Sequence, residues 1–145
     1  MPRCWCVASS KPVMEHPLYR HASEVSFRDT DASGWMHFAN IFHHVELAEH
    51  AFLRSLGLMV FDRNEGGWPR VNVSCDFKRP LLSGDPIEVQ LAIAAVGTSS
   101  VTWKFEVVRS GELAAAGSIT TVRVNHQGQP QPLDDHEREQ LERGL

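Results

Sequence analysis

The sequence predicts an α+β domain in which one long helix packs against an antiparallel sheet of five strands. A broad apolar stripe at helical spacing runs from about Phe38 to Leu56, and four later segments alternate apolar and polar residues with a period of two. Short turns separate these later segments, and tight connections favour antiparallel pairing. One helix covers only one face of such a sheet and terminal strands leave open edges, so we also expect an oligomer.

The composition is that of a globular protein and argues against several classes of partner. The 145 residues suffice for one domain, and the chain is 42% hydrophobic and 22% charged. A net charge of -4 without a lysine-rich or arginine-rich run argues against nucleic-acid binding. No apolar stretch approaches the roughly 20 residues that span a bilayer, and a signal peptide is not expected. The odd set of Cys4, Cys6 and Cys75 indicates reduced thiols in a cytoplasmic protein.

The chain is expected to comprise an irregular leader (1–17), one folded domain (18–126) and a polar C-terminal tail (127–145). Prolines punctuate the leader, and no period is visible there. Residues 133–143 of the tail are expected to form a short charged helix.

Within the domain, the alternation of apolar residues predicts a first strand over Ser23–Arg28, followed by a turn over Asp29–Gly34. The helix then runs from about Phe38 to Leu56 and ends at Gly57, a residue type common just after helices. Its apolar positions are Phe38, Ile41, Phe42, Val45, Ala48, Phe52, Leu53 and Leu56. The four later strands are expected over 71–77, 87–93, 101–107 and 113–125.

Asp31 is the first candidate for chemistry. It lies in a glycine-containing turn shortly before a buried helix, whose first N–H groups lack intrahelical acceptors and carry partial positive charge. Such a helix start can stabilise negative charge on a carbonyl oxygen, while the carboxylate attacks the carbonyl carbon or activates water. Thioester hydrolysis needs both groups and little else. Because aspartate is common in turns, a turn or capping role for Asp31 is the alternative.

Two further carboxylates lie on the predicted helix. Helical geometry places Glu49 near the edge of the apolar stripe and Glu46 at the border with the polar face. A carboxylate in apolar surroundings has a raised pKa and needs a partner. We interpret these residues either as assisting acid or base groups, or as members of an ion pair with Arg54 or with another subunit.

The histidines near the helix give weaker signals. His43, Glu46 and His50 share its polar side, but the H-E-x-x-H order of helical zinc sites is missing. An exposed or interface face is therefore the simpler interpretation, and neither a metal nor a cofactor is predicted. His37, just before the helix, is a candidate for substrate contact, with capping or packing as the alternative.

Basic residues near the strand ends are candidates for binding phosphate groups, because arginine suits bidentate phosphate contacts. They are Lys78 and Arg79, together with Arg70, Arg109 and Arg123. Ordinary charge on edge strands is the alternative interpretation. Trp68, beside two glycines, is expected to line the mouth of a pocket, with a role as a packed aromatic as the alternative. The sequence has no P-loop, no G-x-G-x-x-G and no G-x-S-x-G motif.

Several short motifs within residues 19–126 together resemble one known family. They are Asp31-Ala32-Ser33-Gly34, Phe38-Ala39-Asn40 with Phe42, Glu46 and Ala48, Leu53-x-x-Leu56-Gly57, Phe77-x-Arg79-Pro80-Leu81 and Gly84-Asp85. In this combination the chain resembles the 4-hydroxybenzoyl-CoA thioesterase family of hotdog proteins. It departs from the family at His37-Phe38, where many relatives have Tyr-His, and at Glu49, where an arginine is frequent.

The resemblance implies a hotdog fold, in which a curved antiparallel five-stranded sheet wraps around one long central helix. It also implies dimers with a continuous sheet, often paired into tetramers, and an active site at the dimer interface. Asp31 matches the catalytic aspartate, Glu46 matches a helix glutamate of one branch, and the N–H near Phe38 matches the donor that polarises the thioester carbonyl. Residues expected to contact substrate are Gly34, His37, Phe38, Asn40, Trp68, Lys78 and Arg79, the last two at the CoA phosphates.

The resulting prediction is a thioesterase that cleaves an acyl-CoA, or an acyl-carrier-protein thioester, with Asp31 as nucleophile or general base. CoA is part of the substrate rather than a cofactor. One rival is a hotdog hydratase or dehydratase, but the D-x-N-P-x-H type of segment used by those enzymes is missing after Asp31. The other rival is a non-catalytic acyl-binding hotdog protein, which predicts no turnover with any thioester.

Overall fold

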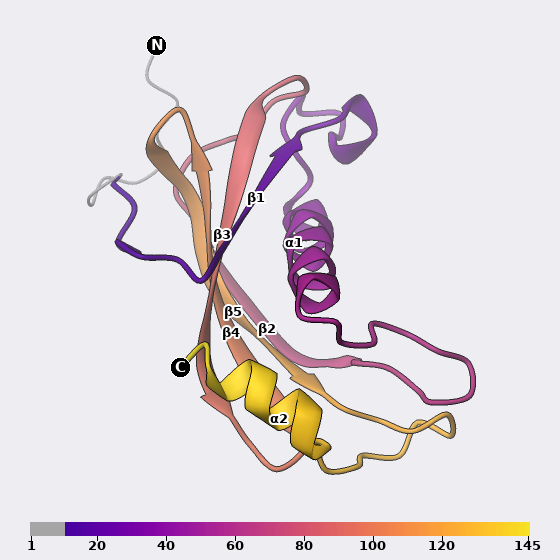
Figure 1. The fold of residues 1–145 in the computed structure, drawn as a ribbon. Helices are drawn as coiled ribbons and strands as arrows, with labels where there is room; N and C mark the ends of the chain where they lie inside the picture. Colours follow the sequence, from indigo (N-terminus) through magenta and orange to yellow (C-terminus); the bar gives the residue numbers. More distant parts are fainter. Residues whose placement is uncertain (1–10) are drawn as a thin grey trace.

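The computed structural model describes residues 11–145, which form strands, two α-helices and two short 3-10 helices (Figure 1). In chain order these are β1 (Tyr19–Glu24), η1 (Phe27–Asp29), η2 (Phe38–Asn40), α1 (Ile41–Ser55), β2 (Arg70–Phe77), β3 (Pro86–Val96), β4 (Ser100–Arg109), β5 (Glu112–Val122) and α2 (Asp135–Glu142). The first ten residues of the predicted leader, with Cys4 and Cys6, lie outside the described residues. The predicted α+β class, with one long helix against a five-stranded antiparallel sheet, is confirmed.

The strands form one antiparallel sheet in the order β1-β3-β4-β5-β2. β3, β4 and β5 are neighbours joined by short turns, as predicted. The expected direct pairing of β2 with β3 is wrong, because β2 pairs with β5 and forms the opposite edge of the sheet. The connection over residues 78–85 is longer than a tight turn, and its Leu81 is buried in the core as the chain crosses the end of the sheet.

The first strand lies earlier than predicted. β1 spans Tyr19–Glu24 and pairs with β3, whereas the sequence indicated Ser23–Arg28. Phe27, expected on the inner face of that strand, is 83% exposed and begins η1. The Ser26 N–H donates to the Asp29 carboxylate at 2.9 Å, and this local bond, typical of a helix start, bends the chain away from the sheet.

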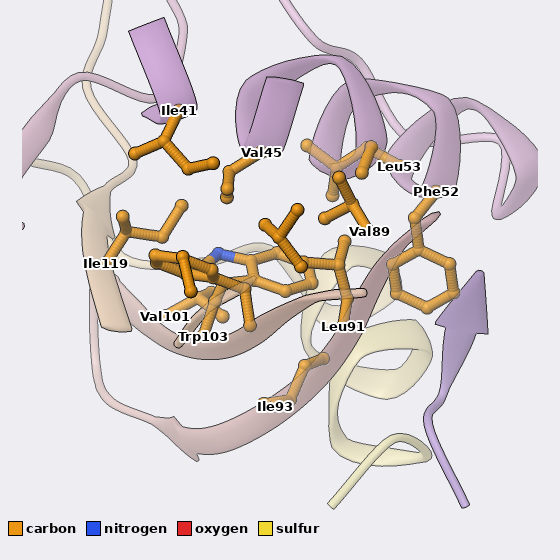
Figure 2. Packing of buried hydrophobic residues seen from close by; sticks show 14 of the residues in the cluster. Ile41, Val45, Phe52, Leu53, Val89, Leu91, Ile93, Val101, Trp103 and Ile119 are labelled. Atoms are coloured by element: carbon orange, nitrogen blue, oxygen red, sulfur yellow. The ribbon is translucent and has the colours of Figure 1, made fainter. Parts of the chain in front are cut away.

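Helix α1 presents one apolar face to the sheet, as Figure 2 shows. The labelled residues are Ile41, Val45, Phe52 and Leu53 from α1 and Val89, Leu91, Ile93, Val101, Trp103 and Ile119 from the sheet. The Phe52 and Trp103 rings meet edge to face, with centroids 5.9 Å apart. Phe38 does not belong to this face and is 63% exposed, because it lies in η2, whose three-residue turn breaks the α-helical spacing.

The C-terminal segment packs on the sheet through α2, and the predicted short helix is confirmed. Leu141 of α2 is fully buried in the core, and the Asp134 carboxylate caps the helix by accepting the Glu137 N–H at 2.7 Å. In Figure 1, α2 lies toward the end of the sheet opposite the turn that follows β1. Neither helix in the described part of the chain has the length and apolar character required of a membrane span.

Candidate active site

Asp31 lies in a tight turn that is tied to the rest of the domain. Gly34 has a φ of +83°, a conformation that favours glycine, and its N–H donates to the Asp31 carbonyl at 3.0 Å. The Met36 N–H then donates to the carbonyl of Leu81 at 2.7 Å, in the segment that follows β2. The turn is therefore anchored to a part of the chain far away in the sequence.

The Asp31 carboxylate is exposed and held by its neighbours. Oδ1 accepts the Ser33 N–H at 2.8 Å and also the Ser33 hydroxyl, while Oδ2 lies 3.4 Å from His37 Nδ1. The Ser33 hydroxyl and N–H, together with His37, lower the pKa of Asp31 below its ordinary value. Because the side chain is 43% exposed, a charged carboxylate faces solvent at neutral pH.

The predicted contact residues His37, Phe38 and Asn40 lie beside this turn at the start of the helix. The His37 N–H and the Asn40 side-chain amide both donate to the Asp29 carbonyl, each at 2.8 Å. The Phe38 ring rests against the His37 ring, with centroids 4.7 Å apart, and is otherwise exposed. The first N–H groups of the helix, and the positive end of its dipole, therefore lie at the same end of the domain as Asp31.

The two helix carboxylates share one arginine. Arg70 Nη1 lies 3.0 Å from Glu46 Oε2, and Arg70 Nη2 lies 2.6 Å from Glu49 Oε2, so their partner is Arg70 of β2 rather than Arg54. Glu49 is fully buried, and its Oε1 has no hydrogen-bond partner among the described residues. Burial raises the pKa of Glu49 to about 7, although Arg70 acts in the opposite direction. Glu46 is 40% exposed and takes part in this cluster.

A cavity of about 570 Å³ opens near the C-terminal end of α1, between residues 60–70, residues 124–128 and His50. Trp68 lines it with only 6% exposure, so this residue is both a packed aromatic and part of a pocket. Its apolar walls come from Val60, Phe61, Trp68, Pro69 and Val124. The 15 residues of α1 span about 22 Å, so this cavity and the Asp31 turn lie toward opposite ends of the helix.

Most of the basic residues predicted to bind phosphate take part in ion pairs. The pairs are Arg79–Glu112 at 3.2 Å, Arg109–Asp85 at 3.1 Å and Arg123–Glu137 at 2.8 Å. Arg79 lines a small cavity together with Met36 and Ile41, which places it and the half-buried Lys78 at the same end of the domain as Asp31. A phosphate-binding role for Lys78 and Arg79 stays a prediction.

A buried histidine and aspartate adjoin the Asp31 turn, and the sequence had indicated neither. His44 Nε2 lies 2.8 Å from Asp29 Oδ2, and His44 Nδ1 lies 2.7 Å from Ser23 Oγ. Burial acts to raise the pKa of Asp29, but the Ser26 N–H and His44 outweigh it, and the pKa is lowered. The available signal was a histidine on the inward side of an apolar helical stripe.

The remaining titratable candidates form no further centre. Residues 11–145 contain no group of three or more His, Cys, Asp and Glu side chains placed to hold a metal ion. His50 lines the cavity, and burial lowers its pKa. Cys75 is a free, half-buried thiol, and burial raises its pKa to about 12, so it is protonated at neutral pH.

A long helix packed against a five-stranded antiparallel sheet is the arrangement of a hotdog protein. A family model described as the Thioesterase-like superfamily matches residues 25–141. The chain belongs to this superfamily.

The chain is similar to a 1,4-dihydroxy-2-naphthoyl-CoA hydrolase from Nostoc punctiforme, with 33% identity over 99 residues, which cover 66% of each protein. Among solved structures, it resembles a gentisyl-coenzyme A thioesterase, with 27% identity, a TM-score of 0.78, and 84% of this chain and 98% of that chain covered. A thioesterase from Thermus thermophilus in complex with coenzyme A and zinc shares 29% identity and a TM-score of 0.76, with 90% and 96% covered. The predicted hotdog fold, family and enzyme class of thioester hydrolase are thereby confirmed.

Proposed function

We propose that this chain hydrolyses acyl-CoA thioesters to a free acid and coenzyme A, with Asp31 as the catalytic carboxylate. One observation carries the proposal: a charged, exposed carboxylate, held by Ser33, lies beside the start of a buried helix. The names of the similar proteins, which are hydrolases or thioesterases of CoA thioesters, support the substrate class.

The reaction needs an attacking group and a site for the negative charge that develops on the carbonyl oxygen. Asp31 Oδ1 accepts two hydrogen bonds from Ser33, and Oδ2, which lies 3.4 Å from His37 Nδ1, is the oxygen proposed to attack the thioester carbon or to take a proton from water. The N–H groups near Phe38 donate to the carbonyl oxygen as negative charge develops on it. If Oδ2 attacks, the C–S bond breaks, coenzyme A leaves as the thiolate and is protonated, and water then hydrolyses the acyl-aspartyl anhydride to the acid and free Asp31. If Oδ2 instead takes a proton from water, the water oxygen attacks the carbon and coenzyme A leaves directly.

A second copy of the chain completes the site in this proposal. Within residues 11–145, strand β2 is an edge strand whose one neighbour is β5, and its Val71 and Val73 are 61% and 45% exposed. An exposed apolar edge of this kind is a template for another strand. A two-fold axis that pairs β2 with its copy also reverses the direction of α1 in the partner. The Trp68 cavity of one subunit then lies toward the Asp31 end of the other and receives the acyl group.

The cavity favours an aromatic acyl group, because aromatic and aliphatic side chains form much of its wall. Its volume of about 570 Å³ leaves ample room for a two-ring system. At the other end of the substrate, we propose that Lys78 and Arg79, which lie at the same end of the domain as Asp31, bind the CoA phosphates. Glu46 supports the site by holding Arg70 at the cavity wall.

The proposal is tested by measuring thiol release from a panel of thioesters: 1,4-dihydroxy-2-naphthoyl-CoA, gentisyl-CoA, acetyl-CoA, palmitoyl-CoA and an acyl-carrier-protein thioester. We expect turnover of at least one CoA thioester, with the aromatic ones preferred. Asp31→Asn should lower kcat by roughly 10²- to 10⁴-fold, because the charged oxygen is lost.

Asp134→Asn is the matched control, since Asp134 is also an exposed aspartate that accepts a backbone N–H, but it caps the distant α2. It should retain the wild-type rate. An Asp31→Asn variant that hydrolyses thioesters as fast as the wild type would overturn the proposed mechanism. A wild-type protein that binds but never cleaves any member of the panel would favour the non-catalytic acyl-binding alternative.

A further inference from the structure

His44 and Asp29 form a buried ionisable pair next to the proposed site, and the mechanism above uses neither of them. Their side chains are 4% and 8% exposed, and the His44 Nε2 to Asp29 Oδ2 distance is 2.8 Å. The same Asp29 oxygen accepts the Ser26 N–H at 2.9 Å. Burying an aspartate is costly unless hydrogen bonds satisfy it, so these two donors are what allow Asp29 to remain inside the domain.

Both ring nitrogens of His44 are hydrogen-bonded. A carboxylate oxygen only accepts, so Nε2 is the N–H that donates to Asp29 at 2.8 Å. The Ser23 hydroxyl, 2.7 Å from Nδ1, is both a donor and an acceptor and pairs with that nitrogen. His44 thus connects β1, which carries Ser23, to the segment that contains Asp29.

Asp29 also holds the proposed site through its backbone. Its carbonyl oxygen accepts the His37 N–H and the Asn40 side-chain amide, each at 2.8 Å, at the two ends of the first helical turn. Asp31 follows Asp29 by two residues in the chain, and the helix start is hydrogen-bonded to the Asp29 carbonyl. The position of Asp29 therefore affects both the attacking carboxylate and the helix start. Any movement of Asp29 changes the separation between the two groups that must meet the thioester.

We infer that His44 is a positioning residue: by fixing Asp29, it holds the Asp31 turn and the start of the helix at the separation that thioester hydrolysis requires. The inference rests on the proposed function, because it takes Asp31 as the catalytic carboxylate. A misplacement of about 1 Å can lower a rate by about 10²-fold, so loss of this one support has a large effect.

Ser23, His44 and Asp29 have the residue types and the hydrogen bonds of a nucleophilic triad, but the burial of His44 argues against that role. His44 is only 3% exposed, so a leaving group has no access to its ring. A triad histidine must pass its proton to a leaving group, which requires contact with the substrate. The structure therefore assigns these residues to support rather than to bond cleavage.

The test compares His44→Leu with the conservative variant His44→Gln, in the full-length protein. Leucine removes both hydrogen bonds, whereas the glutamine amide is able to donate from the position of Nε2. Two measurements are made: kcat and KM with a hydrolysed CoA thioester, and hydrogen exchange of the His37 amide by NMR. We expect His44→Leu to lower kcat and to speed His37 exchange, each by at least about tenfold, with KM changed less than about threefold. His44→Gln should restore most of the wild-type kcat and most of the protection of the His37 amide.

Leu141→Ala is the control for a general loss of stability, because Leu141 is fully buried in α2, away from the Asp31 turn. It should leave kcat and the relative protection of the His37 amide unchanged. The inference is overturned if His44→Leu keeps the wild-type kcat and His37 exchange, or if glutamine and leucine have equal effects. If Asp31→Asn proves fully active, the proposed function fails, while His37 exchange in His44→Leu still decides whether His44 holds the turn.

Discussion

Glu49 gives the stability of this protein a pH dependence that a single substitution should remove. Its carboxyl group is fully buried beside Arg70, and burial raises its pKa from 4.5 to about 7. The folded protein therefore keeps a proton that the unfolded chain loses, so the free energy of unfolding falls as the pH rises through 7. At about 1.4 kcal/mol per pH unit, this difference corresponds to about 3 kcal/mol. Most of this, about 2 to 3 kcal/mol, falls between pH 5 and pH 8.5.

Urea unfolding at pH 5 and pH 8.5, at one fixed protein concentration, measures the effect. Glu49→Gln keeps the shape of the side chain and an oxygen for Arg70 but cannot titrate. Between pH 5 and pH 8.5, we expect the free energy of unfolding of Glu49→Gln to fall by about 2 to 3 kcal/mol less than that of the wild type. Glu46→Gln, which changes the more exposed partner of the same arginine, should keep most of the dependence. Equal pH dependence in Glu49→Gln and the wild type would refute the raised pKa.

Three further predictions concern the proposed dimer, the cavity and the core. Val73→Lys places a charge on the exposed β2 edge and should yield monomers in light scattering, whereas Leu145→Lys, at another exposed apolar residue, should not. Gly66→Ala should lower the free energy of unfolding by about 2 kcal/mol, because φ is +110° and a Cβ would lie 1.9 Å from a carbonyl oxygen. Gly67→Ala should lower the free energy of unfolding much less, because a Cβ at this position would make only ordinary van der Waals contacts. Trp103→Ala should cost about 3 to 5 kcal/mol in urea unfolding, since its side chain is 1% exposed.

The long helix and the last four strands could be predicted because their apolar residues follow a clear period. Ile41, Val45 and Phe52 recur at helical spacing and all lie in the core. The first strand lacks such a pattern, because the half-buried face of β1 carries polar His21 and Ser23. Periodicity also says nothing about which strands pair, so the crossing from β2 to β3 depends on contacts that only the folded chain makes.

The candidate site could be predicted only where its residues are close in sequence. Asp31 and the helix start belong to one short segment, and local geometry brings them together. The pairing of Glu49 with Arg70 joins a helix to a strand across a long loop, and no spacing rule predicts it. The same is true of His44, whose partners are on β1 and η1.

The surroundings of the acidic residues before and on α1 distinguish Asp31, the proposed catalytic carboxylate, from the others. Glu49 is sealed from solvent, Glu46 is held by Arg70, and Asp29 is buried against His44. Asp31 is the member of this set that combines exposure with a lowered pKa.

A lowered pKa keeps the Asp31 carboxylate charged at neutral pH, and the charged form is the one that attacks a carbonyl carbon or takes a proton from water. Both proposed roles, nucleophile and general base, require the charged oxygen at a defined distance from the helix start. Accurate placement of the turn therefore matters in either mechanism, and for this reason we expect its attachment to Asp29 and His44 to affect the rate.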